Sequence, residues 1–253
     1  MEQEIIVTDV TRMGEGQVCV AGVTHHNVTV RLIVGYPGIQ IENLLLDDHC
    51  IIQPRAVLKV DIEPKADCHP PHTEDHKWMR PGRTQWLRLA DETTWKGVLK
   101  RTASPCVAEI FGAELQKNRK IEPDSGERSL ATIKAFRIMR FYCGPDARKE
   151  EEFACRLDFS DGDNTAFFKI PITDLAVNAY VGNLLKQKGL DFEGVAEKLT
   201  AALRRKEVFL RLGLTRPYIM KSGGESWCYL QVNGIYTFPD YLEGKCFADF
   251  LWL

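Results

Sequence analysis

The run Ile5-Ile6-Val7-Thr8-Asp9-Val10 is β-branched at every position except Asp9, a composition typical of a β-strand. The turn Gly14-Glu15-Gly16 separates it from a second β-rich run at residues 17–22, and a third run follows at 28–33. Only short stretches rich in Gly, Asn and His lie between these runs. Three such runs in succession predict an antiparallel meander close to the N-terminus.

The segment after the meander supplies the elements that would close it. A short amphipathic piece covers Ile41 to Asp47, and residues 56–62 form another candidate strand, which ends at Pro64. Three strands, a short helix and a closing strand are the parts of a small closed β-barrel of the OB type. We therefore expect an N-terminal OB-like barrel over residues 1–64.

Residues 65–130 would connect this barrel to the rest of the chain. Residues 64–84 are rich in proline and poor in apolar side chains, so they predict a long loop that is either functional or a linker. The stretch from Asp91 to Arg101 predicts a helix, because acidic residues stand at its start and basic residues at its end.

Residues 131–253 predict a second β unit with two inserted helices. The candidate strands are 131–142, 152–159, 165–170, 207–214 and 226–232, and the candidate helices begin at Asp174 and Asp191. We expect the aromatic tail, residues 236–253, to pack down as a closing segment. The predicted fold class is therefore mainly β with helical inserts (α+β): two OB-like β-barrels joined by a proline-rich loop and a short helix.

Composition excludes several classes of protein. Hydrophobic residues make up 44% of the 253 residues and charged residues 27%, which is ordinary globular composition. No apolar run is long enough to cross a membrane, and the acidic start of the chain is unlike a secretory signal, so we expect a cytoplasmic protein with no membrane partner. The eight cysteines form no C-x-x-C pair, which argues against a zinc ribbon and favours reduced thiols.

The charge is unevenly distributed along the chain. The formal net charge is −2, but residues 1–63 carry 4 basic and 9 acidic side chains, whereas residues 64–148 carry 16 and 11. The middle third is therefore the part to which a polyanion would be attracted first.

Several strings resemble a known family. They are the strand-like strings at residues 6–13 and 18–22, the string Pro71-His72-Thr73-Glu74-Asp75, and two later strings at residues 211–216 and 231–236. Together they resemble bacterial dual OB-domain-containing proteins along most of the chain. The resemblance implies two OB folds but implies no particular chemistry, and it favours His72, Glu74 and Asp75 as residues that matter.

The segment from Cys68 to His76 concentrates metal-ligand types. It holds Cys68, three of the six histidines and two carboxylates within nine residues. A structural zinc site needs four such ligands in a tetrahedral array, and this spacing matches no established pattern. We therefore predict no stoichiometric zinc and no cofactor. We expect His72, Glu74 and Asp75 to hydrogen-bond across the connection between the two units.

Residues 77–101 combine seven basic side chains with three of the five tryptophans. Cations suit phosphates and indole faces suit unstacked bases, so the segment is a candidate interface for single-stranded DNA or RNA. The candidate contact residues are Trp78, Arg80, Arg83, Trp86, Arg88, Lys96 and Lys100. The alternative is that the tryptophans belong to the core and the basic groups form a solvated rim.

Three functions remain open at this point. The first is a non-catalytic binding module for single-stranded nucleic acid or a nucleotide-containing ligand, because no common catalytic motif occurs in the chain. The second is a metal-assisted phosphoester or nucleotide hydrolase that uses His72, Glu74, Asp75 and His76. The third is an adaptor that binds a protein partner within a larger assembly.

Overall fold

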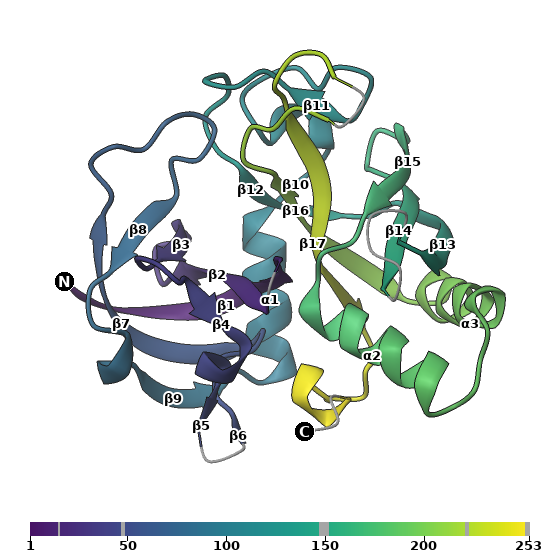
Figure 1. The fold of residues 1–253 in the computed structure, drawn as a ribbon, viewed down its shortest axis with the longest axis horizontal. Coiled ribbons are helices and arrows are strands. Elements are labelled where there is room, and N and C mark those ends of the chain that lie inside the picture. The colour runs from purple at the N-terminus through teal and green to yellow at the C-terminus, as the bar shows by residue number, and fades with distance from the viewer. Residues whose placement is uncertain (15, 47–48, 147–151, 221–222, 251–253) are drawn as a thin grey trace.

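The computed structural model describes residues 1–14, 16–46, 49–146, 152–220 and 223–250 (Figure 1). Within these residues the protein is mainly β, with three α-helices. The N-terminal β unit and the later strands lie side by side, with a helix between them (Figure 1). Among the described helices, none combines the length and the apolar character needed to cross a membrane.

The N-terminal strands close into a five-stranded barrel. Its strands are β1 (Glu2–Arg12), β2 (Gln17–Thr24), β3 (Thr29–Ile33), β7 (Ala56–Pro64) and β8 (Asp75–Trp78). The order around the barrel is β1-β2-β3-β8-β7, and β7 pairs with β1 to close it. All neighbours are antiparallel except β3 and β8, which are parallel. This arrangement is consistent with an OB-like barrel.

Shorter elements flank the strands of this barrel. They are β4 (Ile39–Gln40), the 3₁₀ helix η1 (Ile41–Leu44), β5 (Leu45–Leu46), β6 (His49–Cys50), the 3₁₀ helix η2 (Pro81–Arg83) and β9 (Gln85–Leu89). Strand β9 extends the barrel sheet as an outer neighbour of β7. The amphipathic piece that we expected from Ile41 is therefore a single 3₁₀ turn.

The prediction that residues 64–84 form a long loop is wrong, because β8 lies inside this segment. Strand β8 closes the barrel between β3 and β7, so the barrel extends beyond residue 64. The strand carries Asp75, His76 and Lys77 instead of alternating apolar residues, which explains why the sequence pattern does not reveal it. Its place depends on backbone pairing with residues 31–33 of β3.

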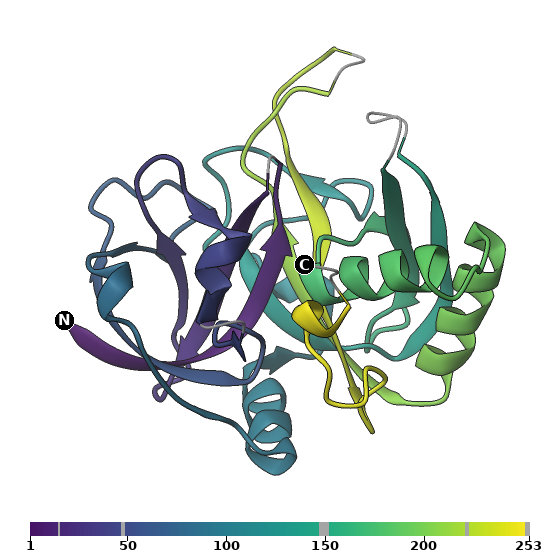
Figure 2. The ribbon, with the colours of Figure 1, turned by 60° about the horizontal axis from the view of Figure 1, so that its bottom comes forward.

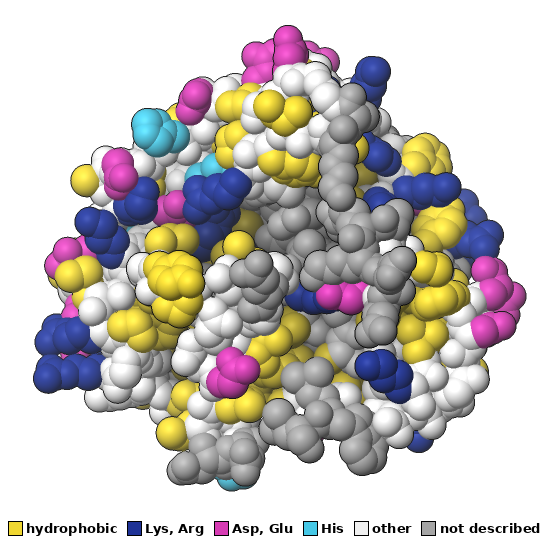
Figure 3. All heavy atoms as spheres, viewed as in Figure 1, with side chains coloured by type: hydrophobic (Ala, Val, Ile, Leu, Met, Phe, Trp, Pro, Cys, Tyr) yellow, Lys and Arg dark blue, Asp and Glu magenta, His cyan; other side chains and the backbone are white. Residues whose placement is uncertain are grey.

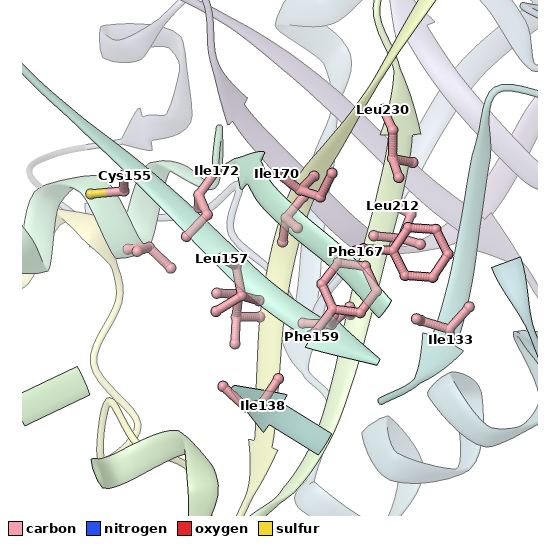
Figure 4. Packing of buried hydrophobic residues seen from close by; sticks show 14 of the residues in the cluster. Ile133, Ile138, Cys155, Leu157, Phe159, Phe167, Ile170, Ile172, Leu212 and Leu230 are labelled. Carbon is pink, nitrogen blue, oxygen red and sulfur yellow. The ribbon is translucent and has the colours of Figure 1, made fainter. Parts of the chain in front are cut away.

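The second half of the chain contains two sheets. The larger has the order β10-β12-β16-β17-β11 and the smaller β13-β14-β15. Their bounds are β10 (Ala103–Ser104), β11 (Lys120–Ile121), β12 (Leu130–Lys134), β13 (Arg137–Pro145), β14 (Phe153–Ser160), β15 (Ala166–Pro171), β16 (Glu207–Leu214) and β17 (Cys228–Phe238). The 3₁₀ helix η3 (Val107–Glu109) lies between β10 and β11. Apolar side chains from both sheets pack together, among them Leu157, Phe159, Phe167 and Leu212 (Figure 4).

The three predicted helices are confirmed as α1 (Glu92–Thr102), α2 (Leu175–Lys186) and α3 (Phe192–Arg204). Each begins after an aspartate whose carboxylate accepts a hydrogen bond from a backbone N–H in the first turn. Asp91 caps α1, Asp174 caps α2 and Asp191 caps α3.

The C-terminal segment packs against the first barrel. The 3₁₀ helix η4 (Phe247–Asp249) lies beside α2 in Figures 1 and 2. Phe247 and Phe250 belong to the same apolar cluster as the barrel interior, together with Leu175 and Ala179 of α2. The expected packing of the tail is thus seen as far as Phe250, and it joins the two halves.

Candidate ligand-binding site at the seam between the two halves

We call the contact surface between the first barrel and the second half of the chain the seam. A buried carboxylate, Glu74, connects the two parts there by hydrogen bonds. It precedes β8 and is 6% exposed. Its oxygens accept hydrogen bonds from the backbone N–H groups of Ser129 (2.6 Å) and Leu130 (2.8 Å) and from the Ser129 hydroxyl (3.0 Å). Three donors satisfy a carboxylate that would otherwise be costly to bury.

Asp75, the next residue, lies between two guanidinium groups. Arg31 of β3 is buried and donates to Asp75 Oδ1 at 3.2 Å, while Arg216, from the segment after β16, donates to Oδ2 at 2.6 Å. Arg31 also donates to the Ser129 hydroxyl. Because Asp75 binds both arginines, it fixes their positions at the surface where the two halves meet.

His72 completes this cluster. Its Nδ1 lies 3.2 Å from Nη1 of Arg31, and burial together with the neighbouring guanidinium groups of Arg31 and Arg216 lowers its pKa to about 3. The ring is therefore neutral at physiological pH, with Nδ1 accepting from Arg31. Its Nε2 is buried, and the Thr215 backbone beside the ring acts against this lowering of the pKa. The structure thus brings His72, Glu74 and Asp75 together at the seam.

A second buried ion pair, between Arg211 and Asp9, also connects the two halves across the seam. Arg211 of β16 is fully buried and donates to Asp9 of β1, with a distance of 2.7 Å between Nη2 and Oδ2. Arg211 also donates to Thr132, and the Thr8 hydroxyl donates to Asp9. Such a pair is stable only because its donors and acceptors are satisfied on both sides.

A cavity of about 520 Å³ opens at this seam, and we call it the seam cavity. The first barrel lines it with the β1–β2 turn and with parts of β2 and β3, and the second half lines it with residues 214–218 and part of β17. The lining includes Arg12, Arg31 and Arg216, and no acidic residue is among the described residues that line it. In the space-filling view, basic side chains lie beside the junction of the two halves (Figure 3).

The rim of the seam cavity carries aromatic and amide side chains. Tyr218 is 43% exposed, and its ring lies against Tyr229 at a centroid distance of 4.8 Å. It belongs to the segment before β17 that projects from the molecule in Figure 2. Gln231 of β17 supplies a half-buried amide, whereas Asn233 is buried and accepts from the Thr173 hydroxyl. A Cβ at Gly213 would come within 2.3 Å of the Asn233 amide, so glycine there leaves room for this side chain.

The candidate contact residues of 77–101 lie elsewhere, and none of them lines the seam cavity. Trp78 is 6% exposed, and its indole N–H donates to Thr84. The Trp78 ring is therefore part of the barrel core, which is the alternative that the sequence left open for the tryptophans. Trp86, by contrast, is 47% exposed on β9.

The basic side chains of this segment divide into paired and exposed groups. Arg80 binds Asp61, and Lys96 binds Glu207 of β16 at 2.5 Å and stands over the Phe238 ring. Arg83, Arg88 and Lys100 are exposed. These positions remain a second candidate surface, separate from the seam cavity.

Most of the ligand-type residues from Cys68 to His76 make contacts within the protein, whereas His69 is exposed. Cys68 Sγ approaches the Asp75 carbonyl, and His76 Nδ1 lies 2.8 Å from the Glu74 carbonyl. Among the described residues, no group of three or more His, Cys, Asp or Glu side chains is arranged to hold a metal ion. The carboxylates that a metal-assisted hydrolase would need are already bound by Ser129, Leu130 and two arginines.

Sequence reasoning did not find Arg12, Arg31, Arg216 or Tyr218. These residues come from three distant parts of the chain, so no local cluster marks them. One signal was present: Arg31 stands between apolar residues in a short strand, where a charged residue is buried only with a partner. A comparison with models of known protein families finds no match, and a search of curated proteins finds no significant match.

Proposed function

We propose that the protein is a non-catalytic binding module for single-stranded nucleic acid or a nucleotide-containing ligand, and that the ligand occupies the seam cavity. One observation carries this proposal: three guanidinium groups, of Arg12, Arg31 and Arg216, line the cavity, and the carboxylates that pair with them, Glu152 and Asp75, lie outside its lining. It also opens on the β2–β3 face and the β1–β2 turn of the five-stranded barrel, the part with which OB folds bind oligonucleotides.

The residues around the cavity suit the parts of a nucleotide. A guanidinium group can donate two parallel hydrogen bonds to a phosphate, and Arg216 is half exposed toward solvent. The Tyr218 ring can stack on an unpaired base. The Gln231 amide can pair with a base edge, which is accessible only in a single strand or a free nucleotide.

We propose further that the second half is also an OB-like barrel, as the resemblance to dual OB-domain proteins implies. The support is its strand pairing. Strand β13 continues the path of β12, β14 pairs with β13 and β15, and β16 pairs with β12 and β17. A parallel bridge between Ile172 and Val232 links the end of β15 to β17. This order repeats that of the first barrel, with α2 and α3 inserted before β16.

Binding of a fluorescent single-stranded DNA or RNA oligonucleotide, titrated over a range of salt concentrations, tests the function. Wild-type affinity should fall as salt rises, because phosphate contacts release counterions. Arg216→Ala should weaken binding to all sequences and reduce the salt slope by about one. Arg83→Ala is the matched control, since Arg83 is exposed and does not line the cavity, and its affinity should equal that of the wild type.

The opposite result would assign the ligand to a different surface. If Arg83→Ala weakens binding and Arg216→Ala does not, the ligand lies on residues 77–101 instead of in the seam cavity. If the wild type binds no single strand and no nucleotide even at low salt, the proposed function is wrong and the protein adaptor takes its place. Thermal unfolding of Arg216→Ala and of Arg216→Lys distinguishes a lost contact from a lost fold.

A further inference from the structure

Two cysteines face each other across adjacent strands of the smaller sheet. Cys143 of β13 is directly opposite Cys155 of β14 in the antiparallel register. Side chains of directly opposed residues lie on the same face of a sheet, and their Cα atoms are about 4.5–5.5 Å apart. Disulfides span Cα separations of roughly 4.4–6.8 Å, so this backbone can accommodate one without rearrangement.

The two thiols also differ in acidity. A hydrogen bond shared between the two thiols lowers the pKa of Cys143, and the same contact together with burial raises the pKa of Cys155. A thiolate therefore forms more readily on Cys143, which is half-buried, and Cys155 is the protonated donor beside it. This asymmetry is the one found in an attacking cysteine and its resolving partner.

The pair is next to a cavity. Cys155 lines a second cavity, of about 450 Å³, together with Arg156 and Ile172. Figure 4 shows the Cys155 side chain close to Ile172. This second cavity shares Arg12, Met13 and Thr173 with the seam cavity, so the two adjoin at the β1–β2 turn. A small hydroperoxide has room to approach Cys155 from this side, and Cys143, which does not line this cavity, is itself partly exposed.

We propose that Cys143 and Cys155 form an oxidisable dithiol site, which hydrogen peroxide converts to a disulfide. The Cys143 thiolate attacks one peroxide oxygen, the O–O bond breaks, and the departing hydroxide takes up a proton to become water. Cys143 is then a sulfenic acid. The Cys155 thiol loses its proton and attacks Cys143 Sγ, and the S–O bond breaks to release a second water. Two thiols and one peroxide thus give one disulfide and two waters.

Another pair of cysteines provides an internal comparison. Cys50 of β6 and Cys246, which precedes η4, also share a side-chain hydrogen bond, with the pKa of Cys246 lowered by it. These two residues belong to a short hairpin and to the C-terminal segment, and no strand pairing holds them opposite each other. We therefore expect disulfide formation at Cys143 and Cys155 under limiting oxidant.

The test uses the reduced full-length protein with one equivalent of hydrogen peroxide, followed by alkylation of the remaining thiols and peptide mapping. The expected result is loss of two alkylation sites and a cross-linked peptide pair that contains Cys143 and Cys155, reversed by dithiothreitol. Cys155→Ser should abolish the cross-link and leave a sulfenic acid on Cys143, trapped by dimedone. Cys228→Ser is the control and should leave the cross-link unchanged.

Several outcomes would overturn the proposal. A cross-link that maps to Cys50 and Cys246 alone would do so, as would no loss of alkylation sites in the wild type. A dimedone adduct on Cys155 in place of Cys143 would reverse the assigned roles. Because the decisive mapping is done on the wild-type protein, the proposal is tested even if a cysteine variant fails to fold, and it does not depend on nucleic-acid binding.

Discussion

The seam cavity and the basic segment 77–101 are both rich in cations, but they hold them differently. In the segment, Arg83, Arg88 and Lys100 are exposed neighbours in sequence, and their charges are surrounded by water. In the seam cavity, Arg31 and Arg216 come from opposite halves of the protein and are both bound to the buried carboxylate of Asp75. The first region is a charged surface, whereas the second is a structure that both halves must assemble.

This difference has physical consequences. Exposed cations are screened by salt and hydrated, so a single substitution among them changes stability little. Buried and paired groups lose their partner's field and their hydrogen bonds when one of them is removed. The two regions should therefore respond to substitution by very different amounts, and that contrast can be measured.

The largest effect is expected for Arg211→Ala, which removes the fully buried partner of Asp9 at the seam. Asp9 is 1% exposed and would be left charged without its guanidinium. Loss of one member of a buried pair costs about 3–5 kcal/mol of unfolding free energy. Chemical denaturation followed by circular dichroism measures it.

The matched substitution in the other region is Arg88→Ala on β9, where the side chain is exposed. Its unfolding free energy should stay within about 0.5 kcal/mol of the wild type. Equal losses in Arg211→Ala and Arg88→Ala would show that the seam is no more a part of the folded core than the basic segment.

The second largest effect is the pH dependence of stability that arises from the aspartate capping α2, compared with the aspartate capping α1. Asp174 caps α2 at the seam, and burial raises its pKa to about 7 although three backbone N–H groups donate to it. Asp91 caps α1 in the basic segment, where it is exposed, and hydrogen bonds from Thr94 lower its pKa. The same capping role thus has opposite electrostatic consequences in the two regions.

The stability of the folded protein is linked to proton binding by Asp174. The unfolded chain releases the Asp174 proton near pH 3.8, but the folded protein keeps it until about pH 7. Its contribution to stability is therefore fully present below pH 3.8 and is lost as the pH rises through about 7. Compared with Asp174→Asn, the wild type should lose up to about 4 kcal/mol between pH 4 and pH 8. A constant difference across this range would contradict the assignment.

The strongest local signals in the sequence were read correctly. The β-branched run at β1 and the aspartate caps of α1, α2 and α3 predicted elements that the structure contains, because each signal depends on neighbouring residues alone. Strand β8 was missed because pairing with β3 creates it, and its residues show no apolar alternation. A strand that is stabilised mainly by distant partners cannot be predicted from its own amino-acid composition.

In the candidate site too, residues close together in the sequence could be predicted and their distant partners could not. The cluster of His72, Glu74 and Asp75 could be singled out because the three residues are close together in the sequence. Their partners, Arg31, Ser129 and Arg216, could not be identified, since they lie more than forty residues from Asp75 and only the fold brings them together. Local charge density therefore pointed to residues 77–101 rather than to the seam cavity.

The third prediction compares one aromatic residue from each region. Tyr218→Ala should weaken single-strand binding by roughly 1–3 kcal/mol while leaving the salt slope nearly unchanged, because stacking releases no counterions. Trp86→Ala on the exposed face of β9 should leave the affinity unchanged. The same fluorescence titrations measure both variants. A loss of affinity in Trp86→Ala alone would place the ligand on the basic segment.

The smallest effect is expected for Lys96→Ala, because Lys96 forms an ion pair between the basic segment and Glu207 of the second half. Lys96 and Lys134 both bind Glu207, and their hydrogen bonds and charges lower its pKa to about 2. The Glu207 contribution to stability is present above its unfolded pKa of 4.5 and is lost as the pH falls toward 2. Because Glu207 is 24% exposed and keeps Lys134, we expect the unfolding free energy of Lys96→Ala to fall by only about 0.5 kcal/mol at pH 7.

Lys100→Ala, one helical turn farther along α1, is the control and should leave the unfolding free energy unchanged. If Lys96→Ala narrows the difference in stability between pH 7 and pH 3 and Lys100→Ala does not, the contact with Glu207 is what sets Lys96 apart from its exposed neighbours. If the two variants behave alike, Lys96 belongs with the solvated cations, and residues 77–101 contribute no ionic contact to the seam.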